Sequence, residues 1–177
     1  MLDKDRIKEA ESNVRIYLKE GLLRKSSLDD NILNILRKNS EESLKVADLI
    51  YKENISALWV IVSSYYSMYY IANAVIYKIG YKVGDQLSHK VTNDALIVFV
   101  RDKLKMSLLE DFEEAKSEAL EITKFTDDII ESFSFERKKR SNFQYNMTAP
   151  VKSSKAQTSI KRAKKFNFEF EKLLNRL

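Results

Sequence analysis

The sequence has no cysteine, one histidine, one proline and three glycines in 177 residues. Without cysteine the chain can form no disulfide, thiolate metal site or cysteine nucleophile, which suits a reducing compartment. One histidine, His89, cannot build a multi-histidine metal site within one chain. Glycine and proline are the usual residues of tight turns, so their scarcity argues against hairpins, sandwiches and barrels. We therefore expect an all-α protein with no metal or other cofactor.

The length fits a single domain, residues 1–177, and no repeat, low-complexity tract or linker divides it. Met1 is followed at once by the charged run Asp3 to Arg6, without the apolar stretch of a secretory signal. We therefore expect a cytoplasmic protein. Little glutamine, no cysteine and abundant Lys, Glu and Ile also favour a thermophile.

The charges are distributed unevenly along the chain. Residues 137–177 hold twelve Lys and Arg against two acidic residues, whereas residues 107–136 hold ten Asp and Glu against two Lys. Two interpretations stay open. The basic end binds an anionic partner such as RNA, or the acidic and basic segments face one another within the fold or across a dimer.

Apolar residues recur at helical spacing through most of the sequence and predict an up-and-down bundle of four to six helices. Ser88 is expected as a helix N-cap, and Gly80 stands where a C-cap glycine belongs. Asn39 and Ser40 mark a point where the second helix could kink or break. The predicted helices cover roughly residues 3–24, 29–50, 54–77, 107–136 and 153–174, and a further helix begins at Ser88.

The stretch from Asn54 to Tyr77 contains no charged residue and is long enough to span a bilayer. Its serines, Asn73 and five tyrosines are scattered along its whole length, whereas membrane helices gather tyrosine at the two interfaces. A helix that is apolar on all sides also suits the centre of a bundle. We expect this stretch to be the central helix and not a membrane span.

The tyrosines of this helix admit two interpretations. Tyr65, Tyr69 and Asn73 share one helical face, and Tyr66 and Tyr70 lie on a neighbouring one. They can be packing residues whose hydroxyls need partners, or they can form a pocket wall or stack on bases. His89, at a helix start, is expected to be exposed or to cap the helix and not to be catalytic.

Three motifs follow one another along the chain. Residues 64–70 read Ser-Tyr-Tyr-Ser-Met-Tyr-Tyr, and this uncharged helix ends in Lys-Ile-Gly-Tyr at residues 78–81. A Ser-His-Lys helix start follows at residues 88–90, and Arg-Ser-Asn-Phe-Gln-Tyr occupies residues 140–145 before a basic closing helix. In these motifs and their order, residues 31–175 resemble the HEPN family. Residues 1–28 would then be an N-terminal helical extension, and residues 107–136 an acidic inserted helix.

The resemblance implies a bundle of four or five helices that is usually a homodimer. Such proteins are frequently encoded beside a minimal nucleotidyltransferase in toxin-antitoxin pairs. Active members are metal-independent ribonucleases in which an arginine is followed four to six residues later by a histidine, and the two chains bring these motifs into one cleft. Here Arg140 matches the arginine, Asn142 matches the inner polar position, and Tyr145 stands in place of the histidine. A tyrosine with a pKa of about 10 is a poor base near neutral pH.

Two functions are therefore expected in parallel, beside a purely structural subunit. The first is a dimeric HEPN-like protein that binds RNA, a nucleotide or a partner nucleotidyltransferase, with Tyr65 and Tyr69 as a pocket wall close to Arg140 and the dimer interface. The second is a ribonuclease that uses Arg140, Asn142 and Tyr145 in a composite dimer site. The residues expected to bind the partner are Arg137, Lys138, Lys139, Arg140, Lys161, Arg162, Lys164 and Lys165.

Overall fold

The computed structural model describes residues 3–135 and 153–177, and residues 122–135 as backbone only. In these ranges the chain forms six α-helices, two three-residue strands and one 3-10 turn, which confirms the predicted all-α helical bundle. None of the helices described is both long and apolar enough to cross a bilayer. The elements in chain order are α1 (Lys4–Glu20), β1 (Leu23–Lys25), α2 (Asp30–Lys52), α3 (Ala57–Lys78), β2 (Tyr81–Val83), α4 (Ser88–Phe99), η1 (Arg101–Lys103), α5 (Met106–Phe135) and α6 (Ser153–Leu174).

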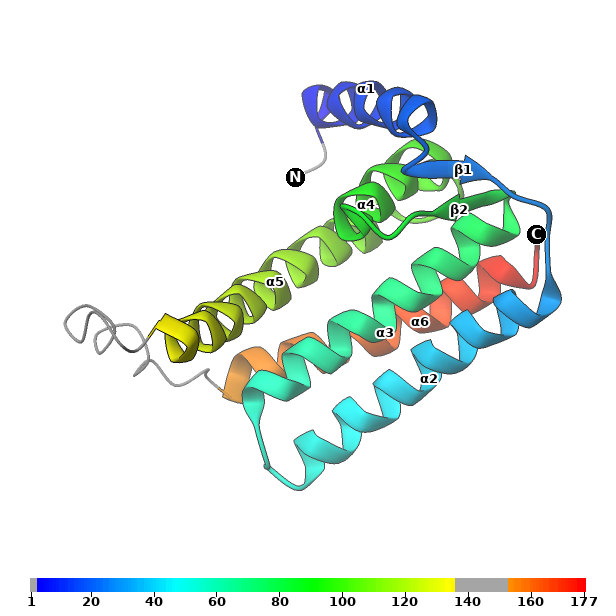
Figure 1. Ribbon diagram of the computed structural model, residues 1–177. Helices are drawn as coiled ribbons and strands as arrows, with labels where there is room; N and C mark the ends of the chain where they lie inside the picture. The colour runs from blue at the N-terminus through cyan, green and yellow to red at the C-terminus, as the bar shows by residue number, and fades with distance from the viewer. Residues whose placement is uncertain (1–2, 136–152) are drawn as a thin grey trace.

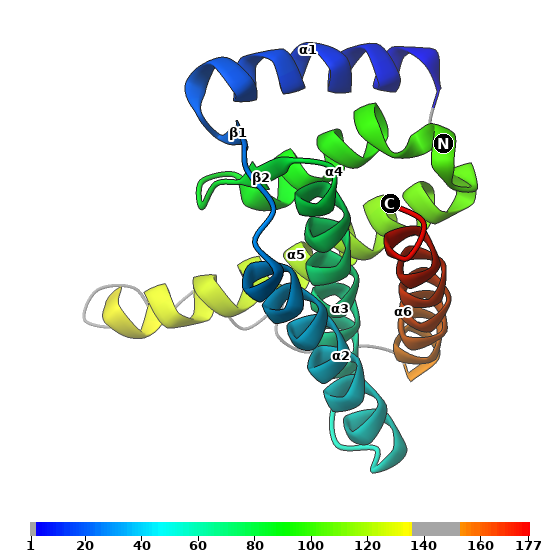
Figure 2. The ribbon, with the colours of Figure 1, turned by 90° about the vertical axis from the view of Figure 1, so that its right-hand side faces the viewer.

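Helix α3 is the central element of the bundle. It packs most extensively against α2 and α6 and also contacts α4, α5 and β2. Figures 1 and 2 show α2, α3 and α6 side by side, with α1 lying across one end, and the view in Figure 2 shows α5 crossing these three helices. The predicted central helix is thus confirmed, with its start moved from Asn54 to Ala57. Asn54 instead has a positive φ of 51° in the turn that follows α2.

An aromatic core joins α3 to α5 and α6. Phe112 of α5 lies between Tyr65 of α3 and Phe166 of α6, at ring-centroid distances of 5.8 and 5.4 Å. Phe166 stacks on Phe170 at 3.9 Å. All four rings are buried. Because each buried aromatic ring removes a large apolar area from water, this core fixes α5 and α6 against α3.

Helix α2 continues through Asn39 and Ser40, so the break that the sequence left open there does not occur. Ser40 is buried, and its hydroxyl lies 2.7 Å from the Ser67 carbonyl oxygen and 2.5 Å from Oδ1 of Asn167. The amide of Asn167 in turn donates to the Ser67 hydroxyl at 2.7 Å. These polar groups satisfy one another where α2, α3 and α6 meet, so Ser40 acts as a bonded core residue and not as a helix breaker.

A two-stranded antiparallel ribbon, which the scarcity of turn residues argues against, connects the first third of the chain to the segment after α3. Leu23 of β1 pairs with Val83 of β2. All three glycines of the chain flank this ribbon. Gly21 and Gly80 follow helices with φ of 75° and 94°, conformations that L side chains rarely adopt. The three glycines therefore serve the ends of this ribbon. Its two strands are far apart in sequence and are not joined by a hairpin turn, so turn motifs in the sequence could not predict their pairing.

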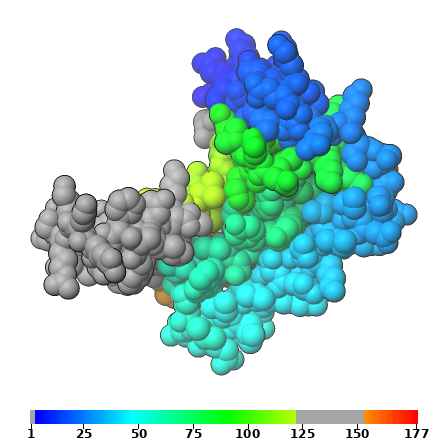
Figure 3. Space-filling view, viewed as in Figure 1, coloured from blue at the N-terminus to red at the C-terminus, as the bar shows by residue number. Residues whose placement is uncertain are grey.

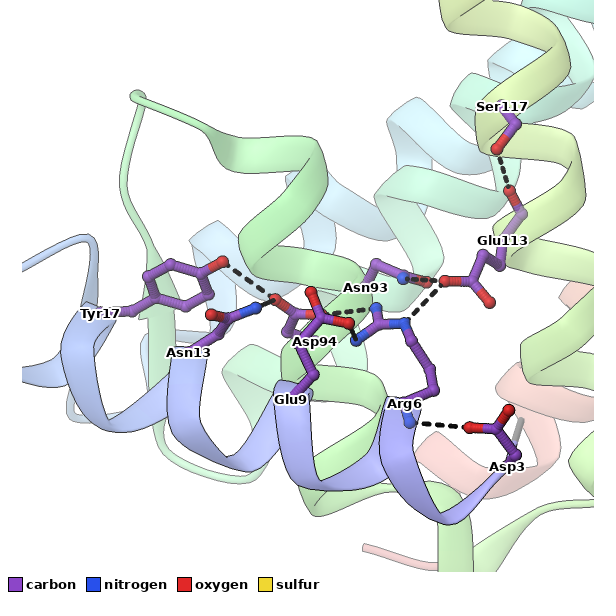
Figure 4. Close-up of polar contacts among 9 residues, drawn as sticks. All are labelled: Asp3, Arg6, Glu9, Asn13, Tyr17, Asn93, Asp94, Glu113 and Ser117. Atoms are coloured by element: carbon purple, nitrogen blue, oxygen red, sulfur yellow. Dashed lines mark hydrogen bonds and ion pairs between the residues drawn. The ribbon is translucent and has the colours of Figure 1, made fainter. Parts of the chain in front are cut away.

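A buried carboxylate holds α1 against the rest of the molecule (Figure 4). Asp94 of α4 is fully buried and accepts hydrogen bonds from Arg6 at 2.6 Å, Tyr17 at 2.9 Å and Asn13 at 3.0 Å, all from α1. Arg6 also donates to Glu113 of α5 at 3.0 Å. Burial, together with the bond to Asp94, raises the pKa of Tyr17. Because every partner of Asp94 in this cluster comes from α1, the cluster ties that helix to α4.

The start of α4 differs from the prediction of Ser88 as N-cap. Leu87 occupies the N-cap position in a left-handed conformation, with φ of 51° and no side-chain capping bond. Its carbonyl accepts bonds from the amides of Lys90 and Val91 at 2.9 Å. The turn that holds Leu87 in this unfavourable conformation places Ser88 and His89 in the first turn of α4.

We expect Asp94→Asn to lower the free energy of unfolding by about 3 kcal/mol, because the half-buried guanidinium of Arg6 loses its closest counter-charge. Urea unfolding at neutral pH measures the change. Asp102→Asn is the matched control, since its carboxylate is 88% exposed and 3.7 Å from Arg101. Equal stability of the two variants would contradict the role given to Asp94.

Candidate functional site

Among the described residues, the helices that pack against α3 leave one face of it uncovered. Trp59, Ser63, Tyr66 and Tyr70 follow one another at helical spacing, and Tyr69 lies beside them. Trp59 is 54% exposed and the other four are half-buried, while the residues between them are buried. We call these five residues the open face of α3.

The tyrosines of this face form a continuous ring cluster. The Tyr66 ring centroid lies 6.2 Å from those of Tyr69 and Tyr70, and the Tyr69 and Tyr70 centroids are 5.7 Å apart. Tyr65 lies beneath them, 1% exposed, with its centroid 5.8 Å from Tyr66. The open face is therefore a set of mutually packed rings on a buried aromatic base, and not a row of isolated side chains.

His89 of α4 packs on this cluster. Its ring centroid lies 4.6 Å from that of Tyr69, 5.5 Å from Tyr65 and 5.9 Å from Tyr66. Its Nδ1 lies 2.7 Å from the buried Tyr65 hydroxyl. The expectation that His89 is exposed or caps the helix is wrong, since it is half-buried and bonded to α3. Sequence spacing could not reveal this contact, which depends on how α4 packs against α3.

The bond to Tyr65 decides which nitrogen of His89 carries the proton. The Tyr65 hydroxyl proton needs an acceptor, and Nδ1 is its only hydrogen-bond partner among the described residues. Tyr65 therefore donates to Nδ1, and neutral His89 carries its own proton on Nε2. Nε2 has no partner in the described part of the chain and is not among its buried unsatisfied atoms, so it reaches the surface. It presents an N–H donor there.

Lys116 of α5 adds a positive charge beside His89. Burial lowers the pKa of Lys116, and the nearby carboxylate of Glu113 opposes that shift. Burial, and then the charge of Lys116, lower the pKa of His89 from its ordinary 6.5. Lys116 has no ion pair within residues 3–121 and 153–177, and its Nζ is not a buried unsatisfied atom. The site thus combines an accessible ammonium with a neutral imidazole donor beside exposed aromatic rings.

The two residues predicted to form a pocket wall have neighbouring rings, with centroids 6.2 Å apart, but only one of them lines a pocket. Tyr69 lines a surface pocket that continues toward β2. Tyr65 is buried behind His89, where it orients the imidazole without reaching that pocket. The predicted motif residues Arg137, Lys138, Lys139, Arg140, Asn142 and Tyr145 lie outside the described residues, so their distance from Tyr65 and Tyr69 stays a prediction.

Three of the four predicted binding residues of α6 face carboxylates of neighbouring helices. Arg162 is buried to 8% side-chain exposure and lies 3.0 to 3.5 Å from the acidic residues Asp111, Glu114 and Glu118 of α5. Lys165 pairs with Asp111 at 3.2 Å, and Lys164 pairs with Asp48 of α2 at 2.5 Å. The interpretation of facing acidic and basic segments therefore describes this part of the bundle.

Lys161 is the exception among the predicted binding residues of α6. It is exposed and has no ion pair in the described ranges. A single exposed lysine on a helix is an ordinary solvated side chain, and the other three cations are engaged within the chain. The α6 surface is accordingly a less favourable anion site than the one beside His89.

Another pocket, of about 480 Å³, lies between α2 and α6. An ion pair crosses it, with Arg37 bonded to Glu171 at 2.6 Å. The Ser40 hydroxyl and the Asn167 amide at its lining are bonded within the core. Because Arg37, Glu171, Ser40 and Asn167 already have partners, much of the hydrogen-bonding capacity of this pocket is used within the protein.

No group of three or more His, Asp or Glu side chains in the described ranges is arranged to hold a metal ion. No protein-family model matches the chain, and no curated protein matches it significantly. The site must therefore be judged from its own geometry.

We expect Arg162→Met to lower the free energy of unfolding by about 1–2 kcal/mol, because three carboxylates of α5 lose their shared charge-assisted partner. Chemical denaturation gives the value. Lys161→Met, one residue away and exposed, serves as control. A variant of Arg162 as stable as that of Lys161 would show that the facing charges do not hold α5 to α6.

We expect the pKa of His89 in the folded protein to lie below 6.5, and Lys116→Met to raise it toward 6.5. Since the chain has one histidine, a pH titration of its imidazole signals by NMR is unambiguous. Lys90→Met, in the same turn as His89, is the control. A His89 pKa that responds equally to both substitutions, or to neither, would refute the placement of Lys116.

The same shift gives a stability prediction with a defined sign. Below pH 6.5 the unfolded chain binds the His89 proton more readily than the native chain, so stability falls as pH drops through this window. We expect this acid loss to be smaller in His89→Gln. Unfolding curves of both proteins at pH 5.5 and 7.5 measure it, and equal losses in the two proteins would contradict a half-buried imidazole with a lowered pKa.

Proposed function

We propose that the chain is a HEPN-like protein that binds single-stranded RNA at the open face of α3, with the phosphodiester backbone contacted by His89 and Lys116. The observation that carries the proposal is the packing of His89, whose Nε2 has no partner among the described residues, against half-buried aromatic rings of α3. Lys116 adds a positive charge near enough to lower the pKa of His89. The resemblance in residues 31–175 supports it independently.

The aromatic side of the site favours unpaired bases. Proteins bind single strands by stacking bases on aromatic side chains beside a positively charged groove. Trp59 is 54% exposed and Tyr66, Tyr69 and Tyr70 are half-buried. Rings held in a packed cluster lose little further entropy on stacking, which favours binding. Double-stranded RNA would hide its bases from these rings.

The polar side of the site favours phosphate. The Nε2–H of His89 and the ammonium of Lys116 are both donors, and neither has a partner in the described ranges. A phosphate oxygen accepts hydrogen bonds from both kinds of group. The carboxylates of Glu113 and Asp94 are bonded to Arg6, so they neutralise the positive charge of Lys116 only in part.

The same geometry favours binding over cleavage at this site. A neutral imidazole with its proton on Nε2 and its Nδ1 bonded to Tyr65 offers no free lone pair to remove a 2′-hydroxyl proton. His89 therefore positions a phosphate and does not supply the histidine missing at Tyr145. Cleavage of RNA by the purified protein without metal would point to the ribonuclease alternative instead.

The test is fluorescence anisotropy with a short labelled single-stranded RNA across a salt series. We expect Trp59→Ala to weaken binding by about 1–3 kcal/mol through lost stacking. Lys116→Gln should weaken binding and reduce the slope of log K against log salt by about 0.7, the value for one phosphate contact on a single strand.

Two variants of α6 are the controls for this experiment. Phe168→Ala removes an aromatic ring that is 60% exposed, comparable with Trp59, and Lys161→Gln removes an exposed charge. We expect both to bind like the wild type. Weaker binding in the α6 variants with wild-type binding in the Trp59 and Lys116 variants would move the interface to α6 and refute the proposal.

A further inference from the structure

A second pocket, of about 290 Å³, adjoins the open face of α3. It lies between α2, α3, β2 and the loop that leads into α4. Four of its lining residues are tyrosines, Tyr69 and Tyr70 of the open face together with Tyr77 and Tyr81. The size is at the lower limit of small-molecule pockets, so it fits one small planar group and not a chain of them.

Asn73 supplies a buried polar group to this pocket. It is 9% exposed and lines the cavity. Its amide donates one N–H to the Tyr69 carbonyl oxygen at 2.9 Å, and its Oδ1 accepts from Thr92 at 3.3 Å. An asparagine amide has two N–H donors and two acceptor lone pairs, so one donor and one acceptor position remain uncommitted. The two hydrogen bonds fix the orientation of the Asn73 amide, and its remaining donor and acceptor can bond to the polar edge of a ligand.

The mouth of the pocket carries balanced charge. Lys82 and Asp85 both line it, and both are exposed. One cation and one anion do not favour a charged ligand over a neutral one, but they offer a donor and an acceptor to a polar, uncharged group. The Tyr77 hydroxyl is already engaged, since it donates to the Ser27 carbonyl oxygen and accepts from the Asp29 amide.

The pocket is continuous with the proposed phosphate contacts. Tyr69 lines the pocket and also packs against the His89 ring at 4.6 Å. Ser88 lines the pocket and is the residue before His89. The left-handed Leu87 fixes this pair at the start of α4. Only the Tyr69 ring and the backbone of Ser88 therefore lie between a group in the pocket and a phosphate at His89.

We propose that this pocket receives a single unstacked base of the bound RNA, with Asn73 contacting the base edge and the tyrosines enclosing its faces. This inference rests on the proposed function and adds a base-reading subsite to it. A purine or pyrimidine is planar, uncharged and rich in donors and acceptors, which matches the aromatic walls, the uncommitted amide positions and the balanced mouth. Bases splayed out of single strands are commonly read in this way.

Glycine NMR signals report on the pocket with little ambiguity. The chain has three glycines, so selective 15N-glycine labelling gives three amide signals. Gly84 lines the pocket, whereas Gly21 lies at the end of α1 and serves as the internal control. The single histidine ring reports separately on the phosphate contacts. The probes are the four ribonucleosides, their 5′-monophosphates and inorganic phosphate.

We expect at least one nucleoside to shift Gly84 and leave Gly21 unchanged, its 5′-monophosphate to shift Gly84 and His89, and inorganic phosphate to shift His89 alone. Tyr70→Ala should weaken the nucleoside response by about tenfold or more, and Tyr51→Ala, a half-buried tyrosine outside the pocket, should preserve it. If RNA or phosphate shifts His89 while no nucleoside or monophosphate moves Gly84, the base pocket is refuted and RNA binding stands. If neither signal responds to any probe or to RNA, both proposals are refuted.

Discussion

An uncharged helix must be covered on nearly every side before it is stable in water, and the rest of this bundle meets that requirement. Helix α3 has no charged residue between Glu53 and Lys78. If all its sides faced water, the protein would lose the free energy that burial of this apolar surface contributes to folding. Helices α2 and α6 cover two of its sides, and α4, α5 and the ribbon cover most of what is left. The α1 helix in turn covers α4, and lies at the end of the molecule away from the α2–α3 connection (Figure 3).

The proposed function depends on the face of α3 that the other described elements do not cover. The open face of α3 carries rings and one small hydroxyl residue, which can face water without an unsatisfied polar group and still offer apolar area to a ligand. Tyr65 lies just beneath the face and sets the tautomer of His89 from below. The core thus determines which donor the surface presents, because a buried hydroxyl must give its proton to the only acceptor it reaches. The charge of Lys116 lowers the pKa of the same His89, and we propose that this ammonium pairs with a phosphate of the bound RNA.

Helical periodicity was enough to predict most of the fold, because the apolar residues of α1, α2 and α6 repeat at helical spacing and the scarce glycine and proline leave few alternatives. Helix α3 was predicted instead from its length without a charged residue. It failed where tertiary contacts override local preference. Ser40 reads as a breaker but is bonded to α3 and α6, and the ribbon joins segments separated by two helices. Tyr65 and Tyr69 were found from their shared face, whereas the contribution of His89 and Lys116 required the packing of α4 and α5. The basic residues of α6 looked available in sequence because their carboxylate partners lie on other helices.

The most direct test of the central claim is to map where RNA touches the protein. Ultraviolet cross-linking of bound single-stranded RNA, followed by tryptic digestion and mass spectrometry, can resolve this, because no Lys or Arg lies between Lys52 and Lys78 and the whole open face falls in one peptide, residues 53–78. The account predicts that this peptide carries cross-linked nucleotide. Bound RNA whose cross-links are confined to residues 153–177, with none in residues 53–78, would contradict it.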